Sequence, residues 1–436
     1  MFKAFYPSAL ASLVLTAAVV LSPLSAIAAP PKAVTLAQAL ALATANNRLL
    51  QASKYASTSA AAGLHQAEAS RLPNLSAGMT GSNTVGFSHV APSMTLAYDL
   101  DTHGERGARI QIAKLQAGAA ELELDRQARS VRFDVIGAYY DLQGADDLVR
   151  ITALNAKNAE LSLADARALR RGGEGTEFDI QRSQVQLSLA HQAQADAERT
   201  RAVSRRLLAR LLGMAPGAEA EAADPIKVVG TWPMSLDASI ARAHENRPEL
   251  AISDRQVAVA KAQRQLALAP LWPHTDVFVT ADSPDVLTPG VASASSLPGN
   301  MGYTVGARLN WLLFDGGGAR QGAAQAEAQT ASAEAQRSDT ELQVELDVVQ
   351  AFADMQAGLK NIEASVQGLD VARLGLDSAR ARFKGGVGTQ TDVLLAQNDI
   401  YQAESGKLRA VLNYNKALAA LERSCAQAPG GIVVPR

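Results

Sequence analysis

Two stretches of the chain, residues 170–184 and 383–397, match each other without a gap at an offset of 213 residues. Their sequences are RRGGEGTEFDIQRSQ and FKGGVGTQTDVLLAQ. The identical pairs are Gly172/Gly385, Gly173/Gly386, Gly175/Gly388, Thr176/Thr389, Asp179/Asp392 and Gln184/Gln397. A double glycine destabilises the interior of a helix and supplies the positive φ of a tight reversal. Because alanine-rich segments with helical periodicity flank each stretch, each is predicted to form the tip of a helical hairpin.

The segments that flank the two tips predict long helices over 104–170 and 318–382 and return helices over 177–212 and 391–423. At about 1.5 Å per residue, each long helix would span about 100 Å and each return helix about 55 Å. Apolar residues step by four and three along the long segments, which is the period of a coiled-coil seam. The seam positions are Val131, Val135, Ala138, Leu142, Ala145 and Val149, and again Val344, Val348, Ala351, Met355, Gly358 and Ile362.

A second set of repeated positions lies nearer the N-terminus, at an offset of 200 residues. Residues 35–71 predict one helix of about 37 residues that begins at a Thr35 cap, and its first part recurs over 235–250. Pro73 and Pro273 follow at the same offset, where each helix is expected to stop. The chain is therefore predicted to contain two copies of one helical arrangement.

Strand-like alternation follows each proline and predicts one β-hairpin in each half, over about 74–101 and about 274–313. Loops rich in glycine, serine and proline are expected at 81–92 and 283–300. Strands of roughly 9–13 residues match the length of a tilted strand that crosses a bilayer. Four strands are too few to close a barrel, and an open edge in lipid leaves backbone groups unpaired. Other copies of the chain would have to complete it, giving eight strands with two copies or twelve with three.

The N-terminal sequence is typical of an exported protein. Lys3 precedes an apolar run, and a small-x-small site follows, so residues 1–28 are predicted to be a signal peptide cleaved after Ala28. No cysteine follows that site, and no lipid attachment is expected there. The single cysteine, Cys425, excludes a disulfide framework within one chain and is expected to be structural. A formal net charge of −2 gives no argument for nucleic-acid binding.

These features together resemble the outer membrane efflux protein (TolC) family over essentially the whole mature chain. The resemblance depends on the duplication, on Pro73 and Pro273, on the strand-to-helix motifs YDLD at 98–101 and LFDGG at 313–317, and on the pattern RFxxGxxxxxDVLxAQ at 382–397. It implies a mainly α protein with membrane β, in which a homotrimer builds a twelve-stranded β-barrel continuous with a twelve-helix periplasmic α-barrel. The expected units are a first repeat at 29–212, an equatorial linker at 213–234, a second repeat at 235–425 and a tail at 426–436.

The same resemblance implies an exit duct in the outer membrane, extending into the periplasm, for tripartite efflux or type I secretion of small molecules or proteins. Its partners would be a periplasmic adaptor and an inner-membrane pump of the RND, ABC or MFS type. No covalent chemistry and no cofactor are expected. The alternative function is that of a soluble periplasmic coiled-coil scaffold, which has no need for strands of bilayer length. Neither the cargo nor the particular pump can be identified from the sequence.

The family's functional positions carry over onto the two tips. The adaptor-docking residues would be Gly172, Gly173, Gly385, Gly386, Val387, Gly388 and Thr389. Asp392, with Asp179 as its counterpart in the first repeat, would narrow the channel entrance. Phe383 and Gly388 stand where a tyrosine and an arginine help lock the closed tip in some members, and Leu395 stands where some members have a second acidic ring. The resemblance therefore does not say how this entrance is held shut.

Each predicted site has a simpler structural interpretation. Asp179 and Asp392 would also cap the helices that they begin, since aspartate is favoured there. Tyr98, Trp272 and Trp311 would form an aromatic girdle at the membrane interface or serve in ordinary packing. Arg308 alternates with the apolar residues of its strand and is placed on the lumenal face. The six histidines show no ligand spacing, so no metal site is predicted.

Overall fold

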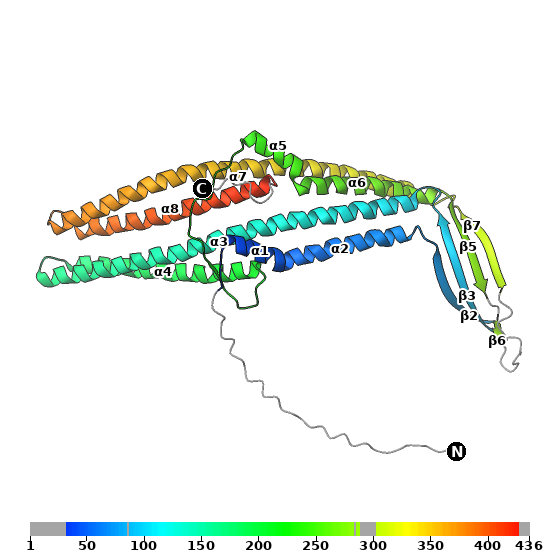
Figure 1. Cartoon of the computed structure of the whole chain (residues 1–436), viewed down its shortest axis with the longest axis horizontal. Coiled ribbons are helices and arrows are strands. Elements are labelled where there is room, and N and C mark those ends of the chain that lie inside the picture. The colour runs from blue at the N-terminus through cyan, green and yellow to red at the C-terminus, as the bar shows by residue number, and fades with distance from the viewer. Residues whose placement is uncertain (1–31, 85–86, 283–284, 288–301, 427–436) are drawn as a thin grey trace, which may run out of the picture.

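The computed structural model describes residues 32–84, 87–282, 285–287 and 302–426. The predicted signal peptide, much of the expected loop at 283–300 and nearly all of the tail lie outside these residues. Figure 1 shows an elongated molecule with the β-sheet at one end, two helical tips at the other and long helices between them. This arrangement was expected from the lengths of the predicted elements.

Two long helical hairpins make up about half of the chain. The first consists of α3 (Glu105–Gly172) and α4 (Glu177–Leu211), and the second of α7 (Gly318–Lys384) and α8 (Gln390–Ser424). These bounds agree with the predicted ones to within two residues. Val135, Leu142 and Val348 on the predicted seams are fully buried, so the heptad pattern correctly located the packed face of each long helix. No described helix has both the length and the apolar character of a membrane span.

The prediction of one continuous helix over 35–71 is wrong. The structure has α1 (Leu36–Asn46) and α2 (Arg48–Ala69), separated by the extended residue Asn47. The Asn47 side chain accepts hydrogen bonds from the amides of Leu49 and Leu50, and its Nδ2 donates to the Leu211 carbonyl at 2.8 Å. The break exists because this one side chain both caps the second helix and ties it to the end of α4.

The second repeat has the same break, made with different chemistry. α5 (Leu236–Asn246) and α6 (Pro248–Leu268) meet at the extended residue Arg247, and Pro248 occupies the first position of α6. Proline is favoured at that position because its missing N–H has no partner there in any case. A short 3₁₀ turn, Ala269–Leu271, then leads into the sheet.

The sheet is antiparallel, in the order β2 (Asn74–Thr84), β3 (Phe87–Leu100), β5 (His274–Asp282) and β7 (Gly302–Asn310). A three-residue strand, β6 (Asp285–Leu287), also pairs with β3. The expected loop at 81–92 is wrong, because β2 and β3 continue pairing to Thr84 and Phe87. The last strand also ends earlier than predicted, at Asn310 rather than near 313.

The register gives the sheet one apolar and one polar face. Leu96 pairs with Leu75 and Val279, and Val279 pairs with Val305. One residue along, the row is formed by Ser76, Thr95, Thr280 and Thr304. The apolar face is open to the surroundings, since Met79 is 74% exposed and Val305 70% exposed. Arg308 pairs with Asp276 in a row on the polar face, as predicted.

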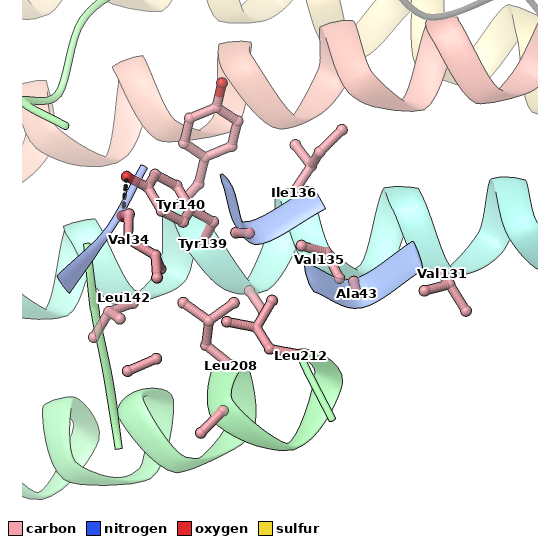
Figure 2. Packing of buried hydrophobic residues seen from close by; sticks show 14 of the residues in the cluster. Val34, Ala43, Val131, Val135, Ile136, Tyr139, Tyr140, Leu142, Leu208 and Leu212 are labelled. Carbon is pink, nitrogen blue, oxygen red and sulfur yellow. Dashed lines mark hydrogen bonds between the residues drawn. The ribbon is translucent and has the colours of Figure 1, made fainter. Parts of the chain in front are cut away.

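Midway along the helices, short strands that the sequence did not reveal pack against the predicted seam of α3. A parallel pair of short strands, β1 (Lys32–Val34) and β4 (Ala220–Ala222), lies beside α3 and α4. Figure 2 shows Val34, Tyr139, Leu142, Leu208 and Leu212 packing together there. A second cluster joins Trp232 to buried residues of α7 and α8. Both halves of the duplication therefore have their largest cores at mid-length.

The linker at 213–234 is fastened to the helices rather than loose. The Asn415 Nδ2 on α8 donates to the Lys227 carbonyl at 2.8 Å, and its Oδ1 accepts from the Val229 amide at 3.0 Å. The Tyr414 hydroxyl donates to the Gly230 carbonyl at 3.0 Å. Both side chains are buried, so α8 satisfies three backbone polar groups of this segment, on Lys227, Val229 and Gly230.

Candidate functional site at the helical tips

The first tip reverses within four residues. α3 ends at Gly172, and Gly173 adopts φ = 84°. The amides of Glu174 and Gly175 then both donate to the Leu169 carbonyl, at 3.0 and 3.1 Å. These bonds satisfy carbonyls that the end of a helix leaves without partners. The second tip repeats the geometry at Gly386, with φ = 74°.

Only one glycine of each pair therefore requires the left-handed backbone. Gly172 is the last residue of α3, and a Cβ placed on it would meet nothing within 4 Å. Gly175 is required for a different reason, since a Cβ there would lie 2.9 Å from the Arg170 amide nitrogen. A Cβ on Gly388 would lie 3.0 Å from the Arg382 Cβ. Gly175 was recognised in the repeat but left out of the predicted docking residues.

Asp179 and Asp392 both cap the helices that leave the tips. Asp392 Oδ2 accepts from the Thr389 amide at 2.9 Å, and the Asp392 amide donates to Thr389 Oγ1 at 3.2 Å. Thr176 and Asp179 form the same reciprocal pair. The structural interpretation is thus confirmed for both residues. Hydrogen bonds from Thr389 hold the pKa of the exposed Asp392 carboxyl below its ordinary value, and the Arg382 charge lowers this pKa further.

The two hairpins are joined near the tips by hydrogen bonds that no sequence pattern indicated. The Gln390 Nε2 donates to the Ser162 carbonyl at 2.9 Å, and the Ser162 hydroxyl donates to Gln397 Oε1 at 3.2 Å. Arg182 donates to Thr391 Oγ1 at 3.2 Å. Arg182 is three residues after Asp179, and Thr391 immediately precedes Asp392. The starts of α4 and α8 therefore face one another. This places the two predicted entrance residues at the same end of the elongated molecule.

A cleft of about 850 Å³ lies between the hairpins beside these bonds. α3 lines one wall, with Asp165 and Leu169, and the second tip lines the other, with Phe383 and Gly388. Val387 projects from the second tip and is 73% exposed. The predicted docking residues thus combine a projecting apolar side chain with the edge of a cleft of mixed polarity. Leu395, on α8, is exposed.

The predicted aromatic residues lie at the opposite end, where the strands meet the helices. Trp272 lies two residues before β5, and Trp311 directly follows β7; both are more than half exposed. The Trp311 Nε1 donates to the Leu271 carbonyl at 3.2 Å. Tyr98 is half-buried on the apolar face of β3, with the Arg106 guanidinium 5.3 Å from its ring centre. Phe314, three residues after Trp311, is 85% exposed and was not counted among the predicted girdle residues.

Comparison with known proteins gives a family match over both halves of the chain. The model of a family described as "Outer membrane efflux protein" matches residues 39–214 and 239–427. The pyoverdine export outer membrane protein OpmQ of Pseudomonas putida is 25% identical over 76% of this chain and 69% of its own length. Protein CyaE of Bordetella pertussis is 27% identical over 45% of this chain, but the match spans only 42% of CyaE.

Solved structures share the fold at lower identity. The outer membrane protein VceC of Vibrio cholerae superposes with a TM-score of 0.77 at 18% identity, over 89% of this chain and 95% of VceC. The Campylobacter jejuni CmeC outer membrane channel gives a TM-score of 0.79 at 15% identity, over 92% of this chain and 86% of CmeC. These likenesses support a mainly α fold with membrane β and two repeated halves.

Proposed function

The chain belongs to the outer membrane efflux protein family, and from this premise we propose that it is the exit duct of a tripartite efflux or type I secretion system. As a member of the family it lies in the outer membrane and extends into the periplasm. The family consists of channel proteins rather than enzymes. Beyond this, we propose the kind of export system that this chain serves and the partners that it binds.

The observation that carries the proposal is the two-faced sheet at the end of the helical rod. Strands of 9–14 residues would extend about 30 Å or more at about 3.3 Å per residue, which matches the hydrocarbon thickness of a bilayer. Their apolar face is exposed in the single chain, and Leu309 on it is 64% exposed. A soluble scaffold would lose solubility by exposing such a face, whereas lipid would cover it. The scaffold function is therefore not favoured.

A homotrimer would complete the structure. β2 and β7 are the outer strands of the described sheet, and unpaired strand edges are not tolerated in lipid. If β7 of one copy paired with β2 of the next, three copies would close twelve long strands into one barrel. The polar rows, with Thr95, Thr280 and Arg308, would then line the lumen, and Trp272 and Trp311 would lie at the membrane interface. The α-helices would continue the wall into the periplasm.

At the other end, Asp392 and Asp179 would surround the entrance while they cap their helices. An adaptor that packs onto Val387, Thr389 and the tip glycines would occupy the cleft beside Gln390. Its binding would compete with the hydrogen bonds between the hairpins and move the hairpins apart, which would widen the entrance. These hydrogen bonds would hold the entrance shut in place of the residues that Phe383, Gly388 and Leu395 replace.

The cargo would be a small molecule or a protein selected by an inner-membrane pump of the RND, ABC or MFS type. The match to the pyoverdine exporter covers more of both chains than the match to CyaE. That difference favours small-molecule export. A cargo assay in a strain that carries the cognate pump and adaptor would compare the two classes directly.

The first test is where the mature protein fractionates and how large it is. The proposal expects recovery from outer membranes in mild detergent and a protein mass of three chains by light scattering corrected for detergent. Recovery of a monomer or dimer in the periplasmic extract without detergent would refute the channel and leave the scaffold. The assay does not depend on knowing the cargo.

The entrance is tested by separating the charge of Asp392 from its cap. Asp392→Asn keeps an oxygen that can accept from the Thr389 amide but removes the charge, whereas Thr389→Val removes the capping hydroxyl and keeps the charge. In planar bilayers, Asp392→Asn is expected to lower the cation selectivity of the trimer, and Thr389→Val to preserve it. Asp377→Asn, at an exposed carboxylate on α7, serves as control. Unchanged selectivity in Asp392→Asn would contradict the entrance ring.

A further inference from the structure

Two histidines and a glutamate meet where the sheet joins the helices. His103 lies between β3 and α3, Glu105 is the first residue of α3, and His274 is the first residue of β5. One ligand-type atom from each lies within 4.8 Å of the other two. The junction lies at the sheet end of the long helices in Figure 1. The chain has six histidines in 436 residues, so two beside one carboxylate are unusual in this composition.

The hydrogen bonds around His103 fix which ring nitrogen is free. The Thr102 hydroxyl donates to the Pro273 carbonyl at 3.2 Å, and His103 Nδ1 lies 2.9 Å from the same hydroxyl oxygen. A hydroxyl has one proton, so Thr102 accepts from an Nδ1–H of His103. His103 Nε2 then carries the lone pair, and it lies 4.0 Å from Glu105 Oε2. The His103 side chain is only 8% exposed, so this orientation is held by packing.

The carboxylate is also oriented by its surroundings. Arg109 binds Glu105 Oε1, which leaves Oε2 directed toward His103. In metal sites, a histidine ligand commonly donates its second ring N–H to an oxygen, and a ligating carboxylate is commonly held by a further hydrogen bond. His103 and Glu105 have this arrangement. The pair formed by His65 and Glu68 on α2 lacks these features, since the His65 side chain is 79% exposed.

Positive groups nearby are already engaged. Arg106 lies 3.6 Å from Asp99 Oδ2, and Arg308 covers the Phe278 ring at 5.1 Å. Asp99 Oδ1 also lies 3.9 Å from His274 Nε2. All of these groups except Phe278 line a cleft of about 890 Å³ on the polar side of the junction. An ion could therefore reach Glu105 and His274 from water, and the nearly buried His103 lies beside them.

We propose that His103, Glu105 and His274 bind one divalent transition-metal ion of the zinc class. Two imidazoles and one carboxylate suit Zn²⁺, and a water molecule would take the fourth position. Zn–N bonds of about 2.0–2.1 Å place tetrahedral ligands about 3.3 Å apart, so the three atoms must draw closer than they are here. His274 is 44% exposed and has room to rotate. The ion would link the start of α3, in the first repeat, to β5, the first strand of the second repeat.

This proposal departs from the expectation, drawn from sequence spacing, that the chain has no metal site. His103 and His274 lie more than 160 residues apart in the sequence. The pairing of β3 with β5 and the hydrogen bond from Thr102 to the Pro273 carbonyl bring them together. The ion-binding proposal holds whether or not the protein conducts.

The test uses the full mature protein in detergent, stripped of metal with a chelator. Zn²⁺ binding is measured by competition with a chromophoric chelator, and Co²⁺ binding by its visible absorption. One ion per chain is expected. His103→Ala and His274→Ala should each weaken binding about tenfold or more, in line with the loss of a metal ligand or its support. His65→Ala, at the exposed histidine beside Glu68, is the matched control and should leave binding unchanged.

Thr102 is a positioning residue in this proposal. Thr102→Val should weaken Zn²⁺ binding, and Thr102→Ser should restore it, because serine keeps the hydroxyl that accepts from His103. If the chain binds no Zn²⁺, or if His65→Ala loses as much affinity as His274→Ala, the site is refuted. Because His274 is half-exposed at a strand end, His274→Ala should keep the native circular dichroism. Unchanged Zn²⁺ affinity in folded His274→Ala would equally overturn the proposal.

Discussion

Replacing adjacent glycines at one tip by alanine should have opposite effects on the stability of that tip. Gly172 is the last residue of α3, and Gly173 begins the reversal with φ = 84°. A methyl group at either position would meet no other atom within 4 Å. Steric crowding is therefore the same for Gly172→Ala and Gly173→Ala, and only the backbone conformation differs.

The magnitudes follow from that difference. An alanine in the left-handed region destabilises the folded tip by about 1–2 kcal/mol. Alanine also has less conformational entropy than glycine in the open chain, which stabilises the folded tip by about 0.4–1 kcal/mol. Gly173→Ala should thus destabilise the tip by up to about 1.6 kcal/mol. Gly172→Ala has no strain to offset and should stabilise it by about 0.5–1 kcal/mol. The open-chain contribution is common to both variants, so they differ by the backbone strain of about 1–2 kcal/mol, which is about fivefold to thirtyfold in local opening.

Hydrogen–deuterium exchange of the tip measures this opening directly. The amides of Glu174 and Gly175 donate to the Leu169 carbonyl, and their exchange should be faster in Gly173→Ala and slower in Gly172→Ala. The second tip supplies a repeat of the experiment at Gly385 and Gly386, where only Gly386 has a positive φ. Equal effects of the two substitutions within a tip would refute the reasoning, because the double glycine would then act through something other than backbone conformation.

Two further variants test the packed region at mid-length. Tyr139→Phe removes a buried hydroxyl that donates to Asp224 Oδ2 at 2.8 Å and accepts from the Asp224 amide at 3.1 Å. It should lower the free energy of unfolding by about 1–3 kcal/mol in denaturant titration. The control Tyr55→Phe, at a ring that is 74% exposed, should leave the free energy of unfolding unchanged. A midpoint for Tyr139→Phe equal to the wild type would contradict the hydrogen bonding described. Asn415→Ala releases two hydrogen bonds to the linker and should speed limited proteolysis within 213–234; an unchanged cleavage rate would show that the linker is held by other contacts.

Features with a local signal were predictable from the sequence. The repeat at 170–184 and 383–397 predicted the positions of the two tips. A double glycine favours the turn, and a threonine and an aspartate three residues apart favour the cap of the helix that follows. The 3.5-residue period identified the buried face of α3 and α7, since Val135 and Val348 are fully buried. Alternation identified both faces of the sheet. In each case, neighbouring residues in the sequence contribute to one element.

Features that depend on contacts between distant segments were not predictable. Asn47 interrupts a pattern of good helix formers, and its role depends on the Leu211 carbonyl. The β1–β4 pair joins three-residue segments that carry no periodicity of their own. The hydrogen bond from Gln390 to Ser162 spans the two hairpins, and glutamine is too common on helices to indicate such a bond.

At the second tip, one residue caps a helix and would also belong to the proposed entrance ring. Hydrogen bonds from Thr389 stabilise the ionised form of Asp392 and hold its pKa below the ordinary value. Three such carboxylates near a trimer axis would repel one another, which raises a pKa. The two influences act in opposite directions, so the cap would help the carboxylates of the proposed ring to remain charged at a narrow entrance. Because each cap lies within a single hairpin, movement of the hairpins apart would relieve the repulsion without breaking the cap.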